Sequence, residues 1–341
     1  MEQAKVYFTD FRCHPGLNQH QKLEKLLTTA GMGNIDFEGK IVAIKLHFGE
    51  LGNLAYLRPN YAKTVADFIK ARGGRPFLTD CNTLYVGSRK NAIEHMDAAY
   101  INGFSPFSTG CHVIIADGLR GGDDVEVPVV GGEYVKNAKI GRALMDADII
   151  ISLTHFKGHE QAGFGGTLKN LGMGGGSRAG KMEMHAQGKP SVDTELCVGC
   201  GRCIAVCPKD AITPDYDQAV EVFNYKIAEY AKAVVDGRPS FHISIARDIS
   251  PDCDCHEEND VPMVPDVGMF ASFDPVALDL ACIEAVNRQP ILPGSALAER
   301  GDPHDHDHLH AAHPDTCWQA AIEHGKKIGL GTDEYTLITV K

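Results

Sequence analysis

The 341-residue sequence lacks the features that mark several large classes of protein. It has no basic excess, because 45 acidic residues outnumber 33 basic ones and the formal net charge is −12. This balance argues against nucleic-acid binding and against adhesion to anionic lipid. No run of about 18 apolar residues, the length a membrane-spanning helix needs, is present. The opening MEQAKVYFTDF also lacks the basic start and apolar core of a signal peptide, so we expect a cytoplasmic protein without nucleic-acid or membrane partners.

Nucleotide-binding fingerprints are missing as well. Residues 175–181, GGSRAGK, match the GxxxxGK part of a phosphate-binding loop. Met182 stands where that loop needs Ser or Thr, and no apolar strand leads into Gly175. The stretch GFGGTLKNLG at 163–172 is not a GxGxxG that follows a strand. The sequence therefore predicts no P-loop and offers no flavin or nicotinamide fingerprint.

Strand-like and helix-like stretches alternate along the chain, which is the pattern of a parallel sheet with helices on its faces. Strands are expected at 6–10, 40–48, 75–80, 112–118, 147–156, 241–249, 267–274 and 334–340, with an edge strand at 125–130. Helices are expected between them, including one at 139–147. From 158 to 190 the pattern gives way to a glycine-rich stretch, which we interpret as a loop.

The fold class predicted from this pattern is α/β, with a largely parallel sheet covered by helices on both faces. A small ferredoxin-like cysteine insertion interrupts it. We expect residues 1–190 to form the first part of the α/β domain, 191–215 the insertion, and 216–341 the continuation of the same domain.

The insertion carries the most specific motif in the chain. Of the eleven cysteines, four fall in residues 197–208, CVGCGRCIAVCP. The spacing CxxCxxCxxxCP is the ligand run of a bacterial ferredoxin-type [4Fe–4S] cluster. Four thiolates also make a zinc site, but zinc ribbons usually use two separated pairs. The run predicts a [4Fe–4S] cofactor bound by Cys197, Cys200, Cys203 and Cys207.

A single run raises the question of the fourth ligand, because in two-cluster ferredoxins the last cysteine of each run ligates the other cluster. Either Cys207 closes its own cluster here, or a remote cysteine does. The remote candidates are Cys253 and Cys255 in the stretch DCDCH, where His256 follows. These three residues are also a candidate metal site in their own right.

A series of stretches, taken in order, resembles an uncharacterised domain-of-unknown-function family of iron–sulfur-associated α/β proteins, whose members often carry a ferredoxin-type 4Fe-4S insertion. The matching stretches are 44–53, 76–92, 156–181, 197–208, 252–256, 266–279 and 329–338. The resemblance implies an α/β fold and iron–sulfur binding, and it supplies no established reaction. Many relatives carry two successive cysteine runs, whereas this chain passes from CPKDAI directly to a predicted helix. We therefore do not expect a two-cluster insertion.

Reactive side chains collect where the predicted strands end, at the edge where open parallel sheets bind ligands. Lys45 and His47 are two residues apart on one strand, so they face the same side of the sheet. Lysines beside histidines suit anion binding and general acid–base work near neutral pH. The candidate catalytic residues are Lys45, His47, Glu50, Asp80, His155, Lys157, His159 and Lys169.

A histidine-rich stretch, HDHDHLH at 304–310 with His313 beyond it, could bind a divalent metal. The interpretation we favour is a polar surface loop before the last helix.

The function we favour is that of an iron–sulfur redox protein, and specifically an oxidoreductase. It would couple single-electron transfer to chemistry on a small anionic substrate in a strand-end pocket, with an electron donor or acceptor protein as its partner. One alternative is a ferredoxin-like electron carrier or sensor that docks to a partner without a substrate. Another is a hydrolytic or group-transfer enzyme with a purely structural cluster.

Overall fold

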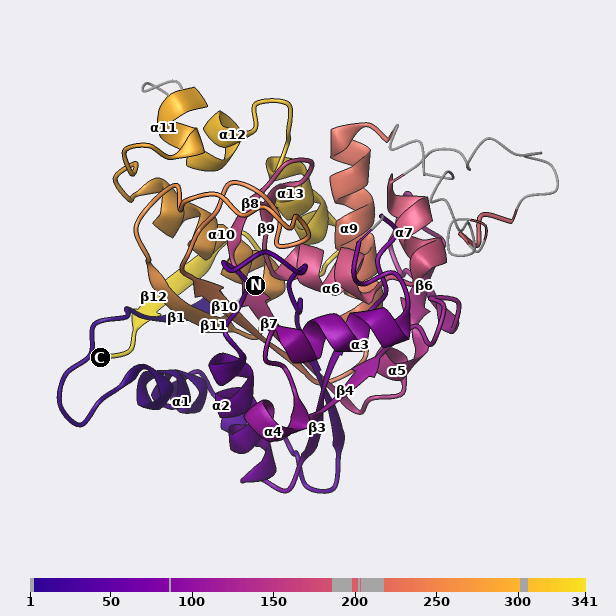
Figure 1. The fold of residues 1–341 in the computed structure, drawn as a ribbon, viewed down its shortest axis with the longest axis horizontal. Helices are drawn as coiled ribbons and strands as arrows, with labels where there is room; N and C mark the ends of the chain where they lie inside the picture. The colour runs from indigo at the N-terminus through magenta and orange to yellow at the C-terminus, as the bar shows by residue number, and fades with distance from the viewer. Residues whose placement is uncertain (1–2, 86, 186–197, 202, 204–217, 301–305) are drawn as a thin grey trace.

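The computed structural model describes residues 3–85, 87–185, 198–201, 203, 218–300 and 306–341 (Figure 1). Its framework is an eight-stranded sheet in the order β12-β1-β11-β10-β7-β2-β3-β4. The strands are β1 (Ala4–Thr9), β2 (Ile41–Lys45), β3 (Arg75–Asp80), β4 (His112–Ile115), β7 (Ile149–His155), β10 (Ser240–Ala246), β11 (Gly268–Ser272) and β12 (Tyr335–Thr339). In this described sheet β11 runs antiparallel to β1 and β10, and the other neighbouring pairs are parallel. The predicted α/β class with a largely parallel sheet is confirmed.

The central strands are hidden on both faces, as near-continuous apolar runs predict for parallel sheets. Every residue of β7 is buried, and so are the last six residues of β10. The eight main strands expected from the sequence are all present in this sheet.

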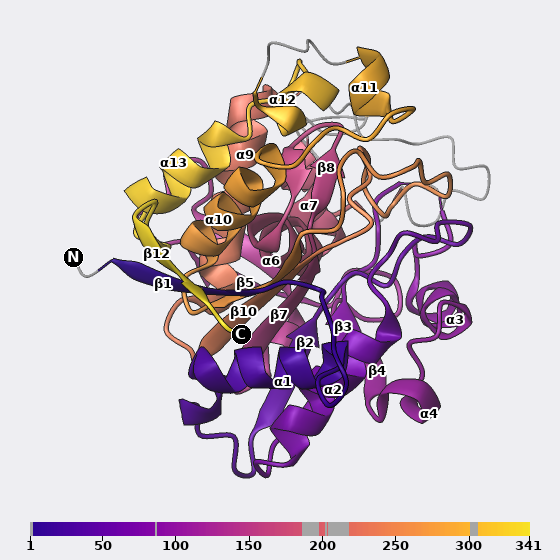
Figure 2. The same ribbon diagram turned by 90° about the vertical axis from the view of Figure 1, so that its left-hand side faces the viewer.

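Helices cover the two faces of the sheet (Figure 2). One face carries α1 (Gln19–Thr29), α2 (Pro59–Lys70), α3 (Ala92–Ile101) and α4 (Pro106–Thr109). The other carries α6 (Thr167–Gly175), α9 (Val220–Val235), α10 (Pro275–Asn287) and α13 (Gln319–Lys327). Each face has its own apolar core, with Leu26 and Val65 in one and Leu171 and Ile227 in the other.

The remaining elements are short. They are η1 (Met32–Asn34), α5 (Arg142–Met145), α7 (Arg178–His185), α11 (Ala296–Arg300) and α12 (His308–Ala312), with two small hairpins, β5 (Asp124–Pro128) with β6 (Asn137–Gly141) and β8 (Lys157–His159) with β9 (Gly163–Gly165). The edge strand expected at 125–130 therefore pairs outside the main sheet. The helix expected at 139–147 divides into the end of β6 and the four-residue α5. Across the described residues, no helix combines the length and apolar character needed to span a bilayer.

The loop expected over 158–190 is wrong for its described part, which forms β8, β9, α6 and α7. Glycine disfavours an isolated helix, but packing against neighbours stabilises α6. A Cβ at Gly172 would lie 2.2 Å from the carbonyl oxygen of Ile227 in α9, and one at Gly174 would lie 2.3 Å from Lys45 Nζ. The glycines thus let α6 approach both α9 and the end of β2 closely.

The main sheet takes strands from both sides of the cysteine run, with β7 before it and β10 next to β7 after it. This arrangement agrees with one α/β domain that resumes beyond an insertion. The boundaries at 190 and 216 stay predictions, because most of 191–215, including Cys197 and Cys207, lies outside the described residues.

Candidate functional site

A pocket of about 780 Å³ lies beyond the carboxyl ends of β2, β3 and β7. Its lining includes every side chain that the sequence nominated for catalysis and the candidate metal ligands of the DCDCH stretch. These residues are Lys45, His47, Glu50, Asp80, His155, Lys157, His159, Lys169, Cys253, Cys255 and His256. The fold thus brings the nominated residues to one place, while their chemical roles stay predictions.

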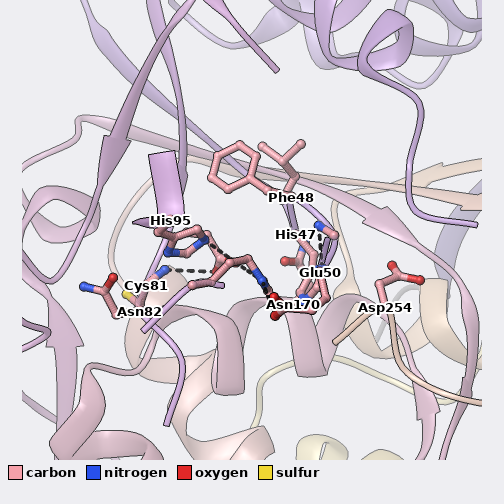
Figure 3. Close-up of polar contacts among 12 residues, drawn as sticks. His47, Phe48, Glu50, Cys81, Asn82, His95, Asn170 and Asp254 are labelled. Atoms are coloured by element: carbon pink, nitrogen blue, oxygen red, sulfur yellow. Dashed lines mark hydrogen bonds and ion pairs between the residues drawn. The ribbon is translucent and has the colours of Figure 1, made fainter. Parts of the chain in front are cut away.

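One side of the pocket, which we call the carboxylate wall, consists of Lys45, Glu50, Asp80 and Arg89. Lys45 Nζ lies 2.9 Å from Asp80 Oδ1 and donates a hydrogen bond to Asn170 Oδ1 at 2.7 Å. Figure 3 labels Asn170 and Glu50 at this place. Arg89 lies 3.2 Å from Glu50 and 3.5 Å from Asp80. Burial alone would raise the pKa of Asp80, but Lys45 and neighbouring cations hold that pKa well below its usual value. Each charge of this wall therefore has an opposite charge beside it.

Asp254, between the two cysteines of the DCDCH stretch, anchors the loop that carries them. Its carboxylate lies 2.9 Å from His155 Nδ1 and 3.0 Å from Lys157 Nζ. Its backbone carbonyl accepts a hydrogen bond from the backbone N–H of Glu50. Burial opposes ionisation of Asp254, but His155 and Lys157 outweigh it and lower the pKa. His155 and Lys157 thus hold the loop in place.

A second group of lining residues, which we call the thiol wall, consists of His47, His159, Lys169, Cys253 and Cys255. Cys253 is buried, and Lys169 Nζ donates to its sulfur at 3.5 Å. A hydrogen bond from Cys255 lowers the pKa of Cys253, burial opposes this, and Lys169 and His159 lower it further, to well below the usual value. The hydrogen bond to Cys253 and burial raise the pKa of Cys255. The geometry therefore favours a Cys253 thiolate beside a Cys255 thiol.

Backbone N–H groups fix the orientation of both histidines in the thiol wall. The N–H of Gly49 donates to His47 Nδ1 at 3.0 Å. The N–H groups of Gln161 and Ala162 both donate to His159 Nδ1, each at 3.0 Å. An imidazole nitrogen that accepts a hydrogen bond carries no proton, so the ring proton of each histidine is on Nε2.

The thiol wall also has the composition of a metal site. The ligand atoms of His47, Cys253 and Cys255 lie within 4.8 Å of one another, and so do those of His159, Glu160 and Cys255. Imidazole and thiolate are ligands that zinc and other transition metals accept, so these residues could hold such an ion.

His256, expected beside the two cysteines as a ligand, has a different neighbour. Its Nε2 lies 3.3 Å from Glu160 Oε1. The hydrogen bond with Glu160 raises the pKa of His256 to about 9, although burial opposes the shift. The structure places His47, rather than His256, in the group with Cys253 and Cys255.

The lining residues that sequence reasoning did not nominate include Arg89, Lys181 and His185. Arg89 precedes α3, and the other two lie on α7. Lys181 ends the GxxxxGK match that we rejected as a P-loop, and that match was its only sequence signal. Arg89 had none, because Glu50 follows β2 and Arg89 follows β3, so that their pairing depends on the order of strands in the sheet.

The described part of the cysteine run lies against α7. Cys203 packs with Leu84 and Met182, and a Cβ at Gly201 would lie 3.6 Å from Met182 Cγ. On the same helix, Lys181 and His185 line the pocket. One helix therefore contacts both the run and the pocket.

The histidine-rich stretch is partly described, since His304 lies outside the described residues. His308 Nε2 lies 2.9 Å from the carbonyl oxygen of Gln289, and His313 Nε2 lies 2.9 Å from that of Pro251. These two histidines thus contact the backbone of neighbouring segments.

Fold and site together define an α/β protein with a cysteine–histidine pocket at the ends of its parallel strands. The chain belongs to the family described as domain of unknown function (DUF362), whose model matches residues 42–284. No curated protein matches the sequence.

Two solved structures are similar at low identity. One is a protein from Thermotoga maritima, with 13% identity and a TM-score of 0.43 over 79% of this chain and 58% of that chain. This chain thus spans less than two thirds of that structure. The other is the lactate racemase apoprotein from Thermoanaerobacterium thermosaccharolyticum, with 12% identity and a TM-score of 0.47 over 99% of this chain and 83% of that chain.

Proposed function

We propose that this protein is an iron–sulfur oxidoreductase. A [4Fe–4S] cluster bound by Cys197, Cys200, Cys203 and Cys207 would exchange electrons with chemistry on a small anionic substrate in the pocket. The observation that carries the proposal is the position of α7, which packs against Cys203 and contributes Lys181 and His185 to the pocket.

The residues present fit such a cluster. The spacing of the run is that of a ferredoxin-type ligand set. Cys200 and Cys203, the two ligands within the described residues, are partly buried free thiols. When bound, the cluster supplies single electrons. All the described cysteines are free thiols, which fits a reducing cytoplasm.

The pocket supports an anionic substrate through two lysines that lie outside the carboxylate wall. The carboxylates of the carboxylate wall already face Lys45 and Arg89, whereas Lys169 and Lys181 line the pocket as further cations. Ammonium groups bind carboxylates and phosphates. His159, with its proton on Nε2, supplies a proton donor at the same place.

The cofactor is tested by measuring iron and acid-labile sulfide in anaerobically purified full-length protein, with electron paramagnetic resonance after reduction. We expect about four irons and four sulfides per chain and their loss in Cys200→Ser. Cys13→Ser, which changes an exposed cysteine, is the matched control and should keep both. Zinc in place of iron and sulfide would contradict the proposal.

The coupling of cluster and pocket needs a separate measurement. Small carboxylates and phosphates are added to the reduced protein, and the resonance signal and the midpoint potential are followed. At least one anion should shift them in the wild type, and the shift should disappear in Lys181→Met. Signals that no anion affects would favour an electron carrier that acts only with a partner protein.

A further inference from the structure

Two segments that are distant in sequence meet at the thiol wall: the loop after β2, which carries His47, and the stretch that carries the two cysteines. The backbone N–H of Glu50 donates to the carbonyl oxygen of Asp254 at 2.9 Å. The side-chain amide of Asn53 donates to the carbonyl oxygen of His256 at 3.0 Å. These two hydrogen bonds hold the loop of the histidine against the loop of the cysteines.

The contact between the loops gathers three ligands of types that zinc accepts. The ligand atoms of His47, Cys253 and Cys255 lie within 4.8 Å of one another. Cys253 is 2% exposed, whereas His47 and Cys255 are partly exposed, and all three line the pocket. Two thiolates and one imidazole, with a fourth position left to water or substrate, form one type of catalytic zinc site. The wall therefore has both the ligands and the open side of such a site.

The two histidines of the thiol wall differ in how their Nδ1 atoms are occupied. His47 Nδ1 accepts one hydrogen bond, from the N–H of Gly49 in its own loop. His159 Nδ1 accepts from two backbone N–H groups of its hairpin and lies 3.5 Å from Glu160 Oε2. An ion at His47 Nδ1 has to displace one N–H group, whereas an ion at His159 Nδ1 has to displace two. His47 is therefore the histidine more open to a metal.

We propose that His47, Cys253 and Cys255 bind one divalent ion of the zinc class, with a fourth position open to the pocket for water or for an oxygen of an anionic substrate. The ion forms bonds to two sulfurs and one nitrogen, and each thiol that binds it releases its proton to solvent. Zinc has no redox chemistry, so the ion would polarise the oxygen bound to it rather than transfer electrons.

Contacts around the ligands hold them in place. The carboxylate of Asp254, which lies between the two cysteines in sequence, is 2.9 Å from His155 Nδ1 and 3.0 Å from Lys157 Nζ. Lys169 Nζ donates a hydrogen bond to the Cys253 sulfur at 3.5 Å. Outer contacts of this kind orient the ligands of metal sites. The loop is thus fixed by contacts that do not use the ligand atoms of Cys255 or His47.

This inference goes beyond the proposed function and does not depend on it. The three ligands are separate from Cys197, Cys200, Cys203 and Cys207, the residues proposed to bind the cluster. Either metal centre can therefore be absent while the other is present.

The first test measures zinc by elemental mass spectrometry in full-length protein purified anaerobically, and again after a chelator has removed zinc and one equivalent has been added back. We expect one zinc ion per chain. X-ray absorption at the zinc edge, which iron does not disturb, should show two sulfur neighbours at about 2.3 Å and a nitrogen at about 2.0–2.1 Å. Protein that takes up no zinc would overturn the proposal, and so would zinc surrounded only by nitrogen and oxygen.

Variants of the ligands locate the ion. Cys255→Ser and His47→Gln should each weaken zinc binding by more than about a hundred-fold, since loss of an outer contact alone costs about 10–100-fold. Cys13→Ser and His20→Gln, at exposed positions, are the matched controls and should bind zinc as the wild type does. Competition with a chromophoric chelator measures the affinity, and circular dichroism shows whether each variant is folded. Wild-type affinity in a folded Cys255→Ser or His47→Gln would contradict the proposed ligands.

Glu160→Gln separates these ligands from a neighbouring group, because the ligand atoms of His159, Glu160 and Cys255 also lie within 4.8 Å of one another. This variant should keep the zinc affinity of the wild type. Zinc should also raise the urea midpoint of both proteins, since an ion that binds only the folded state stabilises it. Loss of zinc in Glu160→Gln would assign the ion to the neighbouring group and overturn the proposal.

Iron analysis separates this inference from the proposed function. Loss of iron in Cys253→Ser would make Cys253 a cluster ligand, which overturns the inference and leaves the proposed function intact. Zinc bound to two sulfurs and a nitrogen in protein that contains no iron would support the inference and contradict the proposed function. Zinc that stays in Cys200→Ser while iron is lost would support both.

Discussion

The two walls line one pocket, yet they use their polar groups differently. In the carboxylate wall, Lys45 faces Asp80 and Arg89 faces Glu50, so the charges satisfy one another. In the thiol wall, Lys169 donates a hydrogen bond to the sulfur of Cys253. Mutual pairing holds strand ends in place, whereas a cation beside a thiol favours the thiolate, which is the reactive form of cysteine.

Asp254 joins the two walls. Its carbonyl accepts from Glu50 of the carboxylate wall, and its neighbours in the chain are the two cysteines of the thiol wall. Changes in the carboxylate wall and at Asp254 should alter stability, and changes in the thiol wall should alter reactivity.

Asp254→Ala should have the largest effect on stability. It leaves His155 and Lys157 buried without their carboxylate, and breaking a buried ion pair costs about 3–5 kcal/mol. The free energy of unfolding, measured with urea, should fall by that amount. Asp260→Ala, in an exposed part of the same loop region, is the control. A loss below about 1 kcal/mol would show that Asp254 is not the anchor.

Lys45→Met should destabilise the protein by about 2–4 kcal/mol at pH 7. This loss is smaller than that expected for Asp254→Ala, because Arg89 still faces Asp80. The pH dependence has a definite sign. The pKa of Asp80 in the folded protein is below its usual value, so its contribution is present above about pH 4 and disappears as the pH falls further.

Urea unfolding at a series of pH values between 7 and 3 measures this difference. The wild type should lose stability more steeply toward acid than Lys45→Met, so that the difference between them narrows toward pH 3. Lys25→Met, on the exposed face of α1, is the control. Parallel curves for wild type and Lys45→Met would show that Lys45 is not what lowers the pKa of Asp80.

Gly172→Ala tests whether α6 supports both walls, since this helix carries Lys169 for one and Asn170 for the other. The added Cβ would lie 2.2 Å from the carbonyl oxygen of Ile227, and overpacking of this kind costs about 1–3 kcal/mol. We expect this loss in urea unfolding. Gly33→Ala, which meets only the flexible Arg72 side chain, should leave stability unchanged. Unchanged stability in Gly172→Ala would contradict the close approach of α6 and α9.

The sequence predicted those parts of the fold that local pattern controls. The apolar run of β7 and the alternation of Lys45 and His47 are local signals, and the rule that parallel strands end at one edge placed their side chains together. The helix α6 was missed because its stability depends on packing that its glycines permit. The intrinsic helix propensity of those glycines disfavours a helix at this place.

Local sequence patterns could not predict which side chains pair within the site, for a similar reason. Arg89 follows a different strand from Glu50, so its role depends on how strands are ordered in the sheet. The orientation of His159 depends on two backbone N–H groups of a hairpin. Sequence pattern could nominate the histidine, but only the folded backbone shows which ring nitrogen carries the proton.

Glu160→Gln should have the smallest effect on stability, because it changes the rim of the thiol wall. Glu160 raises the pKa of His256 to about 9, and both side chains are 39% exposed. A raised histidine pKa stabilises the fold below about pH 6.5, and this stabilisation disappears as the pH rises through about 9. Solvent screening limits it to a few tenths of a kcal/mol.

Nuclear magnetic resonance titration of His256 is therefore the sensitive measurement. Its pKa should fall from about 9 toward about 6.5 in Glu160→Gln, with urea unfolding nearly unchanged. Glu258→Gln is the matched control, because that carboxylate is 79% exposed and 3.7 Å from the same ring. An unchanged His256 pKa in Glu160→Gln would show that the pair does not form. A large loss of stability would instead show that the Glu160–His256 pair stabilises the fold, as the paired charges of the carboxylate wall are expected to do.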